Sequence, residues 1–346
     1  LKKFEGRYNS SIDIYGDDVS NYKIKSNLNG FLREKNNPNN STKNSFSMDL
    51  NGGLFRNNGL LKISNLPLNL ANLFFNKPKD FKGNLDIKLV YNLTEKNFFS
   101  VISSNKTSIN NFALKFDKTF ISFKDSLFNV DMSLWLDKSV ESINLTGNIP
   151  INKEDEIDLK LKGNQRFLEL IGNLSNENFT FNKGDANLRM LIKGRLEKPI
   201  ANGFLFINNG EVDILNNNLK NIEATLIFDF DQVEIKKFSA SSNESGLISL
   251  KGSLPFYEGL DNNKSLNFIS ESLQLVGNKI DFQFDSNIFI KGSLSRPFIS
   301  GKVRLKNGYI NFKTVNGNDK TISKISNKRV QNKSWPELYW SKDKEI

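Results

Sequence analysis

Histidine and cysteine are both missing from the 346 residues of this chain. Without histidine there is no imidazole general base and no Ser-His-Asp triad, and without cysteine there is no thiol nucleophile. Because these two residue types also supply most zinc ligands, the common zinc centres are excluded as well. The composition therefore removes a large set of enzymes. The lack of disulfides is compatible with both the cytosol and a bacterial periplasm.

Long hydrophobic runs are also missing. No stretch of about 18 apolar residues occurs, and the chain does not start with a basic segment followed by an apolar one. We therefore expect either a soluble protein or a piece of a longer, membrane-anchored protein.

The chain carries more positive than negative charge, with 48 Lys and Arg against 38 Asp and Glu. Such an excess can indicate nucleic acid or an anionic membrane as a partner. The charges alternate along predicted strands, however, and most phenylalanines occupy inward strand positions. Nucleic-acid binding would need basic clusters interleaved with exposed aromatics, so we predict a solvated polar face and no nucleic-acid partner.

Acidic residues gather at two places, Asp229-x-Asp231 and Glu154-Asp155-Glu156. Short acidic groups in turns or on wet strand faces are far more often solvated than bound to a metal. The sequence also has no Gly-rich phosphate loop. We therefore predict no metal, no cofactor and no catalytic residue.

One repeated stretch organises what the sequence does contain. Residues 193–214, KGRLEKPIANGFLFINNGEVDI, return without a gap as residues 291–312, KGSLSRPFISGKVRLKNGYINF. The marker residues keep one constant offset: Gly194 with Gly292, Pro199 with Pro297, Gly203 with Gly301, and Gly210 with Gly308. Each copy predicts a strand up to the first glycine, a Pro-bearing connection, a second strand, a tight Asn-Gly turn and a third strand.

Two weaker repeats suggest modules of about 100 residues. The segment around Gly83 returns around Gly184, and residues 143–150 return as 248–255. We predict leading strands and a polar loop at 1–45, a repetitive region at 46–315, and a weakly packed polar tail at 316–346. The predicted modules are 83–183, 184–281 and 282–315.

Apolar and polar residues alternate over most of the chain, which predicts β strands with one buried face. The one helix candidate is short, LPLNLANLFF at residues 66–75. On the order of twenty short strands could form a sandwich, a closed barrel or an open curled sheet. Repeats without a fixed end favour the last. The prediction is an all-β fold: a long, curved, mainly antiparallel sheet curled into an open hydrophobic groove.

The inward strand positions are the candidate site, because they would line this groove. The predicted lining residues are Leu85, Ile87, Leu89, Val130, Met132, Leu134, Ile157, Leu159, Leu161, Val212, Ile214, Ile222, Leu226, Phe228, Phe230, Val233, Ile235, Ile280, Phe282, Phe284, Ile310 and Phe312. On the residues alone, the core of an ordinary β-sandwich is the alternative reading.

With these repeated glycines and prolines, and with Gly147-x-Ile149-Pro150 and Gly252-x-Leu254-Pro255, the chain resembles the TamB family of the AsmA-like superfamily over about residues 46–315. The resemblance implies a curled β-sheet groove in an inner-membrane-anchored envelope protein of diderm bacteria or plastids. The family's N-terminal anchor and C-terminal end are not recognisable, which indicates an internal fragment attached to the membrane only through other regions. The Asn- and Lys-rich composition suggests a cyanobacterial-type member.

Two functional hypotheses follow. The resemblance implies a non-enzymatic periplasmic bridge that carries phospholipid acyl chains between the inner and outer membranes. The alternative is a scaffold or chaperone-like component that assists outer-membrane β-barrel proteins, using an exposed sheet edge for strand addition. A β-helical adhesin is least favoured, because its parallel rungs would repeat at intervals much shorter than about 100 residues.

Overall fold

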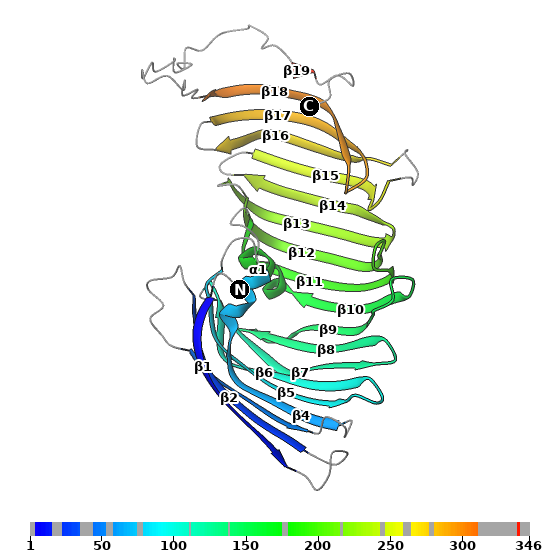
Figure 1. Cartoon of the computed structure of the whole chain (residues 1–346). Coiled ribbons are helices and arrows are strands. Elements are labelled where there is room, and N and C mark those ends of the chain that lie inside the picture. The colour runs from blue at the N-terminus through cyan, green and yellow to red at the C-terminus, as the bar shows by residue number, and fades with distance from the viewer. Residues whose placement is uncertain are drawn as a thin grey trace, which may run out of the picture. The chain divides into compact units, whose positions relative to one another are not determined.

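The computed structural model describes residues 4–15, 23–34, 44–52, 58–74, 79–110, 112–137, 139–174, 179–214, 217–242, 246–258, 264–276, 280–310 and 338–339. These residues form 19 strands, one α-helix and one 3₁₀ helix. The chain divides into two compact units, which are described separately. In each unit the bent strands lie side by side in chain order (Figure 1). The predicted all-β, antiparallel fold is confirmed.

Unit 1 comprises Leu1–Arg166 and Ile192–Pro199. Its strands are β1 (Phe4–Tyr15), β2 (Lys23–Glu34), β3 (Asn44–Gly52), β4 (Asn58–Pro67), β5 (Phe81–Asn92), β6 (Asn97–Ile109), β7 (Phe112–Lys124), β8 (Leu127–Leu136), β9 (Ile143–Pro150) and β10 (Glu156–Asn164). Each strand pairs antiparallel with the next one along the chain. Unit 1 is therefore a continuous ladder of hairpins.

Unit 2 comprises Phe167–Leu191 and Ile200–Ile346. It holds most of α1 (Gln165–Leu174) and of β11 (Phe179–Arg195), followed by β12 (Ile200–Ile214), β13 (Asn217–Phe230), β14 (Gln232–Ser242), β15 (Gly246–Pro255), β16 (Leu266–Val276), β17 (Ile280–Gly292), β18 (Pro297–Ile310) and β19 (Leu338–Tyr339). From β12 to β19 each strand again pairs antiparallel with its chain neighbour.

The predicted helix at residues 66–75 differs from the structure in type and extent. Strand β4 continues to Pro67, and the 3₁₀ helix η1 (Leu68–Phe74) follows it. The buried side chain of Asn72 fixes the return to β5, because it donates to the carbonyl of Lys79 and accepts from the Lys79 N–H. A segment barely three turns long gains too little from helix propagation to dictate α geometry, so its tertiary contacts decide.

The predicted Asn-Gly turns are wrong. Strand β12 runs through Asn209 and Gly210, and β18 runs through Asn307 and Gly308. In β12 the register shifts between Ile207 and Gly210, and Asn209 has a φ of 50°. The left-handed residue is therefore a β-bulge that bends a continuous strand instead of ending it. The strands are consequently longer than predicted.

The repeat itself is visible in backbone geometry. Gly203 and Gly301 have φ values of 152° and 149°. A Cβ atom at Gly203 would collide with the carbonyl oxygen of Arg189 on β11, and one at Gly301 would collide with that of Asn287 on β17. Both copies thus need glycine for the same reason, a close approach to the neighbouring strand.

Bulges occur in both units and bend the sheets. Three of them share one device, in which a left-handed residue turns its N–H toward a carboxylate on the adjacent strand. The pairs are Asn65 N–H to Asp86 at 2.9 Å, Asn209 N–H to Glu223 at 3.1 Å, and Ser272 N–H to Asp285 at 2.8 Å. A bulge leaves one N–H outside the ladder, and here the carboxylate accepts it.

Asn217 adds a further restraint in unit 2. Its side chain accepts from the N–H of Val276 at 2.8 Å and donates to the Val276 carbonyl at 3.4 Å. Asn217 begins β13 and Val276 ends β16, so the amide reaches across the ends of β14 and β15. Val276 pairs with Asp281 of β17 but has no partner in β15, and the Asn217 amide bonds its backbone instead, which restrains the bend of the sheet.

Candidate functional site

The candidate site is the apolar face of each unit, defined here as the face whose rows of cross-strand partners contain the predicted lining residues. In unit 2 one row crosses every strand from β12 to β18: Leu205, Leu226, Ile235, Gly252, Leu266, Ile290 and Ile299. In unit 1 a comparable row crosses β4 to β10: Leu61, Leu89, Ser100, Ile121, Val130, Gly147 and Leu159.

The structure brings the predicted lining residues of each unit onto its apolar face. In unit 1 these are Leu85, Ile87, Leu89, Val130, Met132, Leu134, Ile157, Leu159 and Leu161. In unit 2 they are Val212, Ile214, Ile222, Leu226, Phe228, Phe230, Val233, Ile235, Phe282 and Phe284. Ile280 and Ile310 lie in β17 and β18, but their side chains, like all of Phe312, lie outside the described residues.

Burial divides these residues into two groups. Leu134, Ile157, Val212, Ile222, Val233 and Ile235 are buried. Phe230 and Ile214 are exposed, and the remaining described ones are half-buried. A shared face is therefore established by the register, whereas a lining role remains a prediction.

Helix α1 closes part of the apolar face in unit 2. Its Leu168 packs against a cluster of seven buried residues: Phe181, Val212, Leu219, Ile222, Ala224, Ala240 and Ile248. The helix is amphipathic, and the side chain of Asn164 caps its start by accepting from the N–H of Arg166 at 3.0 Å. This part of the face is thus protein core.

Three phenylalanines on the apolar face of unit 2 are less completely covered than the residues of this cluster. Phe228 stands opposite Gly203, and Phe282 stands opposite Gly308, so each ring can lie over a position without a side chain. The rings of Phe282 and Phe284 lie 5.6 Å apart between centroids. All three phenylalanines are half-buried, and none belongs to a buried cluster.

Small hydroxyl groups interrupt the apolar rows where the sheet bends. Ser270 and Ser286 are cross-strand partners on the apolar face, both buried, and their hydroxyls form a hydrogen bond of 2.7 Å. One hydroxyl donates to the other, so each buried oxygen has a hydrogen-bond partner within the sheet.

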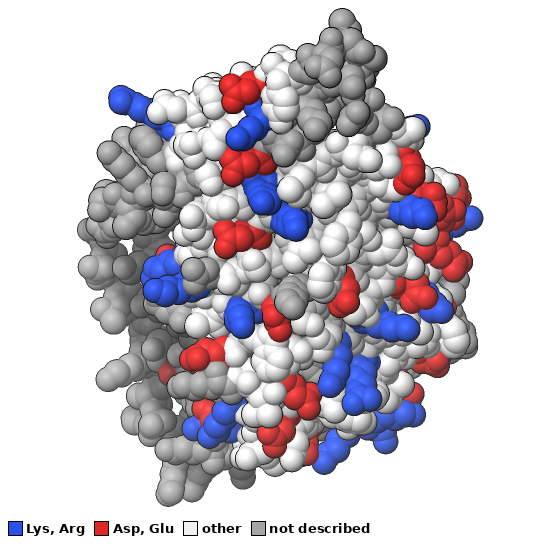
Figure 2. All heavy atoms as spheres, turned by 90° about the horizontal axis from the view of Figure 1, so that it is seen from below, with Lys and Arg blue, Asp and Glu red and all other residues white. Residues whose placement is uncertain are grey.

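The opposite face of unit 2 is polar. Every charged residue of β12 to β18 that has a described cross-strand partner lies on it. Figure 2 shows one view of the molecule, in which acidic and basic side chains are interspersed among uncharged ones. Acidic side chains lie among the basic ones on the face shown.

Hydrogen bonds lower the pKa of three carboxyls on this polar face. The pKa of Glu211 is lowered first by its bond from Lys183, and that of Asp213 by its bond from Asn182. Burial alone would raise the pKa of Asp285, but the bonds from Lys306 and from the Ser272 N–H outweigh burial and leave it below the ordinary value. These carboxylates are structural partners of the strands.

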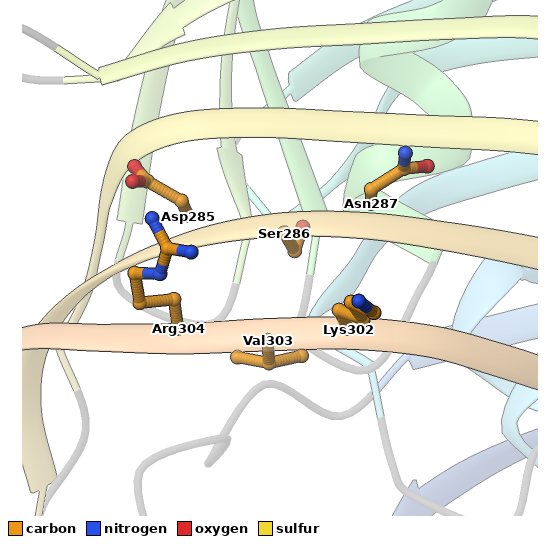
Figure 3. Close-up of a pocket in the computed structure, with 6 residues that line it drawn as sticks. All are labelled: Asp285, Ser286, Asn287, Lys302, Val303 and Arg304. Carbon is orange, nitrogen blue, oxygen red and sulfur yellow. The ribbon is translucent and has the colours of Figure 1, made fainter. Parts of the chain in front are cut away.

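A shallow hollow of about 220 Å³ lies on β17 and β18 (Figure 3). Its lining residues are Asp285, Ser286, Asn287, Lys302, Val303 and Arg304. Asp285 and Arg304 are cross-strand partners, and Lys302 and Val303 also pair with β19. The hollow therefore lies on neighbouring strands close to the end of the ladder, and two of its charged residues, Asp285 and Arg304, stand opposite each other in the pairing.

The acidic groups noted in the sequence lie apart from the apolar face. Glu154 forms an ion pair with Arg195 at 3.0 Å, Asp229 lies on the polar face, and Asp231 lies in the β13/β14 turn. Across the described ranges, no group of three or more acidic residues is arranged to hold a metal ion. In the same ranges, no helix has the length and hydropathy needed to cross a bilayer.

Sequence reasoning missed three features of the site. One is α1. Its sequence, QRFLELIGNL, signals a helix only by the spacing of its apolar residues over about three turns and by the capping residue Asn164 before it. The second is the set of carboxylate-capped bulges, where Asn-Gly was read as a turn. The third is the exposure of apolar residues at one edge of unit 2, because alternation predicts which face a side chain is on but not whether anything covers it.

Comparisons with known proteins give two matches. A family model described as the TamB C-terminal domain matches residues 136–316, which is more than half of the chain. The chain is also 25% identical over 152 residues to Protein SUBSTANDARD STARCH GRAIN 4, chloroplastic, of Oryza sativa subsp. japonica. That match covers 42% of this chain and 7% of the rice protein, so the chain spans a small part of that relative. No solved structure matches the chain.

Proposed function

Because this chain belongs to the TamB family, a family of cell-envelope proteins and not of enzymes, we propose that it is a lipid-carrying segment of an envelope bridge. In this proposal phospholipids move between the inner and outer membranes with their acyl chains on the apolar face. The complete protein is periplasmic and attached to the inner membrane through regions other than those described. The function needs neither a cofactor nor a catalytic residue.

The observation that carries this proposal is the separation of charge from the apolar rows of β12 to β18. An acyl chain can follow the sheet only if successive strands present apolar side chains to it and keep their charged residues on the other face. Such a continuous apolar path is called the lane below. The row from Leu205 to Ile299 has this character, with Gly252 as its only residue without a side chain. Half-buried Phe228, Phe282 and Phe284 supply surface that is not already used in the core.

The energy gained from such a face is sufficient for passive transport. Exposing an acyl chain of about 16 carbons to water costs roughly 13 kcal/mol, at about 0.8 kcal/mol per CH₂. A sheet face that covers half of the chain surface would offset about 6 kcal/mol of this cost. Movement along a uniform apolar row then changes this energy little from strand to strand, so a lipid can advance without a chemical energy source at each step.

Phe284 is the best place to test this proposal. Leu226 packs against both buried clusters, so a charge there would destabilise the fold as well as the lane. Phe284 lies outside both clusters, and Asn287 is an exposed residue of the same strand on the polar face. We expect Phe284→Asp, and equally Phe228→Asp, to lose co-purifying phospholipid and vesicle-to-vesicle transfer at least tenfold, while Asn287→Asp retains both.

Native mass spectrometry of the purified chain, followed by transfer of a fluorescent phospholipid between vesicles, measures these two outcomes. Circular dichroism and thermal unfolding verify that the variants keep the sheet. If Phe284→Asp and wild type carried and transferred the same amount of lipid, the apolar face would not be the lane. If the wild-type chain bound no phospholipid at all, the proposed function would be lost.

A second candidate is favoured by the edge of β18. Among the described residues, β18 is the last long strand of the ladder, and the two-residue strand β19 pairs with it at Lys302 and Val303. A strand at the end of a sheet can accept an additional strand through its backbone N–H and C=O groups. We propose as the alternative function that this edge receives strands of outer-membrane β-barrel proteins. Photo-crosslinking from Arg304 would capture such strands in a lipid-free preparation, and failure to capture them while Phe284 variants abolish transfer would exclude it.

A further inference from the structure

Three hairpin turns of unit 2 lie along one edge of its sheet and are connected to each other. The N–H of Phe256 donates to the carbonyl of Asp231 at 2.7 Å, which joins the β15/β16 turn to the β13/β14 turn. The N–H of Leu294 donates to the carbonyl of Pro255 at 2.9 Å, which joins the β17/β18 turn to the β15/β16 turn. Residues 230–231, 255–258 and 293–299, called the turn rim below, therefore form one preformed strip.

The turn rim, which consists of three turns and the strand ends beside them, exposes large apolar side chains. The exposed fractions are 58% for Phe230, 50% for Leu294, 65% for Phe298 and 64% for Ile299. Such a concentration at one edge is typical of a surface that meets an apolar partner.

The β17/β18 turn and the start of β18 carry apolar side chains on both sides of the sheet. Ile299 is the cross-strand partner of Ile290 and belongs to the apolar face, whereas Phe298 is the partner of Lys291 and belongs to the polar face. Leu294 lies at the tip between them. Contact with an acyl chain on the apolar face would cover Ile299, but it would not cover Phe298 or Leu294. A partner for the tip must therefore contact it from both sides of the sheet.

The side chains around the tip favour a lipid bilayer as that partner, and the rim itself carries one basic residue, Arg296, and two acidic ones, Asp231 and Glu258. Lys291 stands opposite Phe298, and Arg296 lies between Leu294 and Phe298 in the turn, where it contacts Glu258 at 3.5 Å. Tyr257 adds an aromatic side chain with a polar end on the same strip. Apolar tips inserted beside Lys, Arg and Tyr match the boundary between acyl chains and phosphate headgroups.

The turn rim also opens directly onto the apolar face. Phe230 continues the alternation of Phe228 and Leu226 on β13, and Ile299 ends the row that runs through Ile290. No charged residue stands in these rows between the rim and the lane. An acyl chain leaving a bilayer at the rim would therefore stay in contact with apolar side chains.

We propose that the turn rim is a membrane-contact surface, where Leu294 and Phe298 insert into a phospholipid bilayer and acyl chains pass onto the apolar face. The passage of acyl chains rests on the proposed function, whereas the membrane contact does not.

A fluorescence experiment tests the contact, and the lack of native cysteine makes it direct. Leu294→Cys is labelled with the environment-sensitive dye NBD, and Leu247→Cys serves as the matched control. Leu247 is a similarly exposed leucine, at 55%, but it is the second residue of β15 and lies at the opposite edge of the sheet. Vesicles of phosphatidylcholine with phosphatidylglycerol should raise and blue-shift the emission at position 294 several-fold, and leave position 247 unchanged.

A second measurement separates the rim from the lane. The variant Leu294→Asp/Phe298→Asp should co-sediment with these vesicles at least fivefold less than wild type, and load less lipid from them, while Leu247→Asp behaves as wild type. Binding of a lysophospholipid offered as monomers should be the same in all three, because the lane is intact.

Three results would overturn the membrane contact: no NBD response at position 294, equal responses at both positions, or normal co-sedimentation of the double variant. Lipid binding that persists despite any of these would leave the proposed function standing. Conversely, a positive NBD response together with no lysophospholipid binding by wild type would support the membrane contact and refute the proposed path for acyl chains on the apolar face.

Discussion

Replacing Asp285 with alanine tests how the bulges hold the bend of unit 2. The Asp285 carboxylate accepts the N–H of Ser272 at 2.8 Å and contacts the ammonium of Lys306 at 2.7 Å. Ser272 is the left-handed residue of the β16 bulge, with a φ of 50°. Without the carboxylate, its N–H has no acceptor in the ladder.

The expected loss follows from these two contacts. A hydrogen bond between a backbone N–H and a charged acceptor is worth about 1.5–3 kcal/mol. The ion pair adds at most about 1 kcal/mol, because the Asp285 and Lys306 side chains are 30% and 36% exposed. We therefore expect Asp285→Ala to lower the free energy of unfolding by about 2–3 kcal/mol. Asp285→Asn keeps an acceptor for the N–H and should lose about 1 kcal/mol.

The pKa of Asp285 gives the effect a pH dependence with a defined sign. This pKa is lowered in the folded chain from the ordinary value of 3.8. A carboxyl with a lowered folded pKa adds stability that is fully present above its unfolded value and is lost as the pH falls through its folded value. The difference between wild type and Asp285→Ala should thus be full at pH 7 and shrink below about pH 4.

Hydrogen–deuterium exchange of peptides that cover β16 measures the local effect, and urea unfolding followed by circular dichroism measures the global one. Glu271→Ala is the control, since Glu271 is an exposed acidic residue on the same polar face and lies in β16, the strand whose exchange is measured. Equal exchange of β16 in Asp285→Ala and wild type, or equal acceleration in Glu271→Ala, would refute the capping role. A difference that persisted unchanged at pH 3 would refute its electrostatic origin.

Two further perturbations address the bend and the repeat. Asn217→Ala removes both bonds to Val276 and should cost about 2–3 kcal/mol, seen as a lower thermal midpoint; an unchanged midpoint would mean that the sheet bends without this restraint. Gly203→Ala and Gly301→Ala both force a Cβ against a backbone carbonyl and should each cost at least about 2 kcal/mol in urea unfolding; losses of very different size would contradict the equivalence of the two copies.

The strands and their faces could be predicted because apolar residues alternate in the sequence with a period of two, and side chains alternate between the two faces of a strand with the same period. Ile87 and Leu89, or Phe282 and Phe284, face one side in any strand, whatever its neighbours are. Pairing in chain order then places the faces of successive hairpins together. For this reason the described lining residues of each unit share a face, although no contact between them could be read from the sequence.

Bends and coverage could not be predicted in the same way. Asn209-Gly210 suits a left-handed turn and a left-handed bulge equally well, and only the continuation of pairing to Ile214 distinguishes them. Likewise, burial of Val212 but exposure of Ile214 depends on where α1 lies and how sharply the sheet bends, which are tertiary properties. The same limit applies to the turn rim, since Phe298 and Ile299 are consecutive residues that a strand places on opposite faces.

Each strand of a unit pairs with the strand that precedes it in the chain. A protein built in this way can therefore change its length by gaining or losing one hairpin, that is, two consecutive strands. Removing two consecutive strands, such as β14 and β15, would let the flanking strands meet in the same antiparallel sense and with the same side inward. Removing one strand would make its former neighbours parallel and require a crossover connection. The span of the protein can thus be adjusted in steps of about 10 Å, twice the spacing between strands.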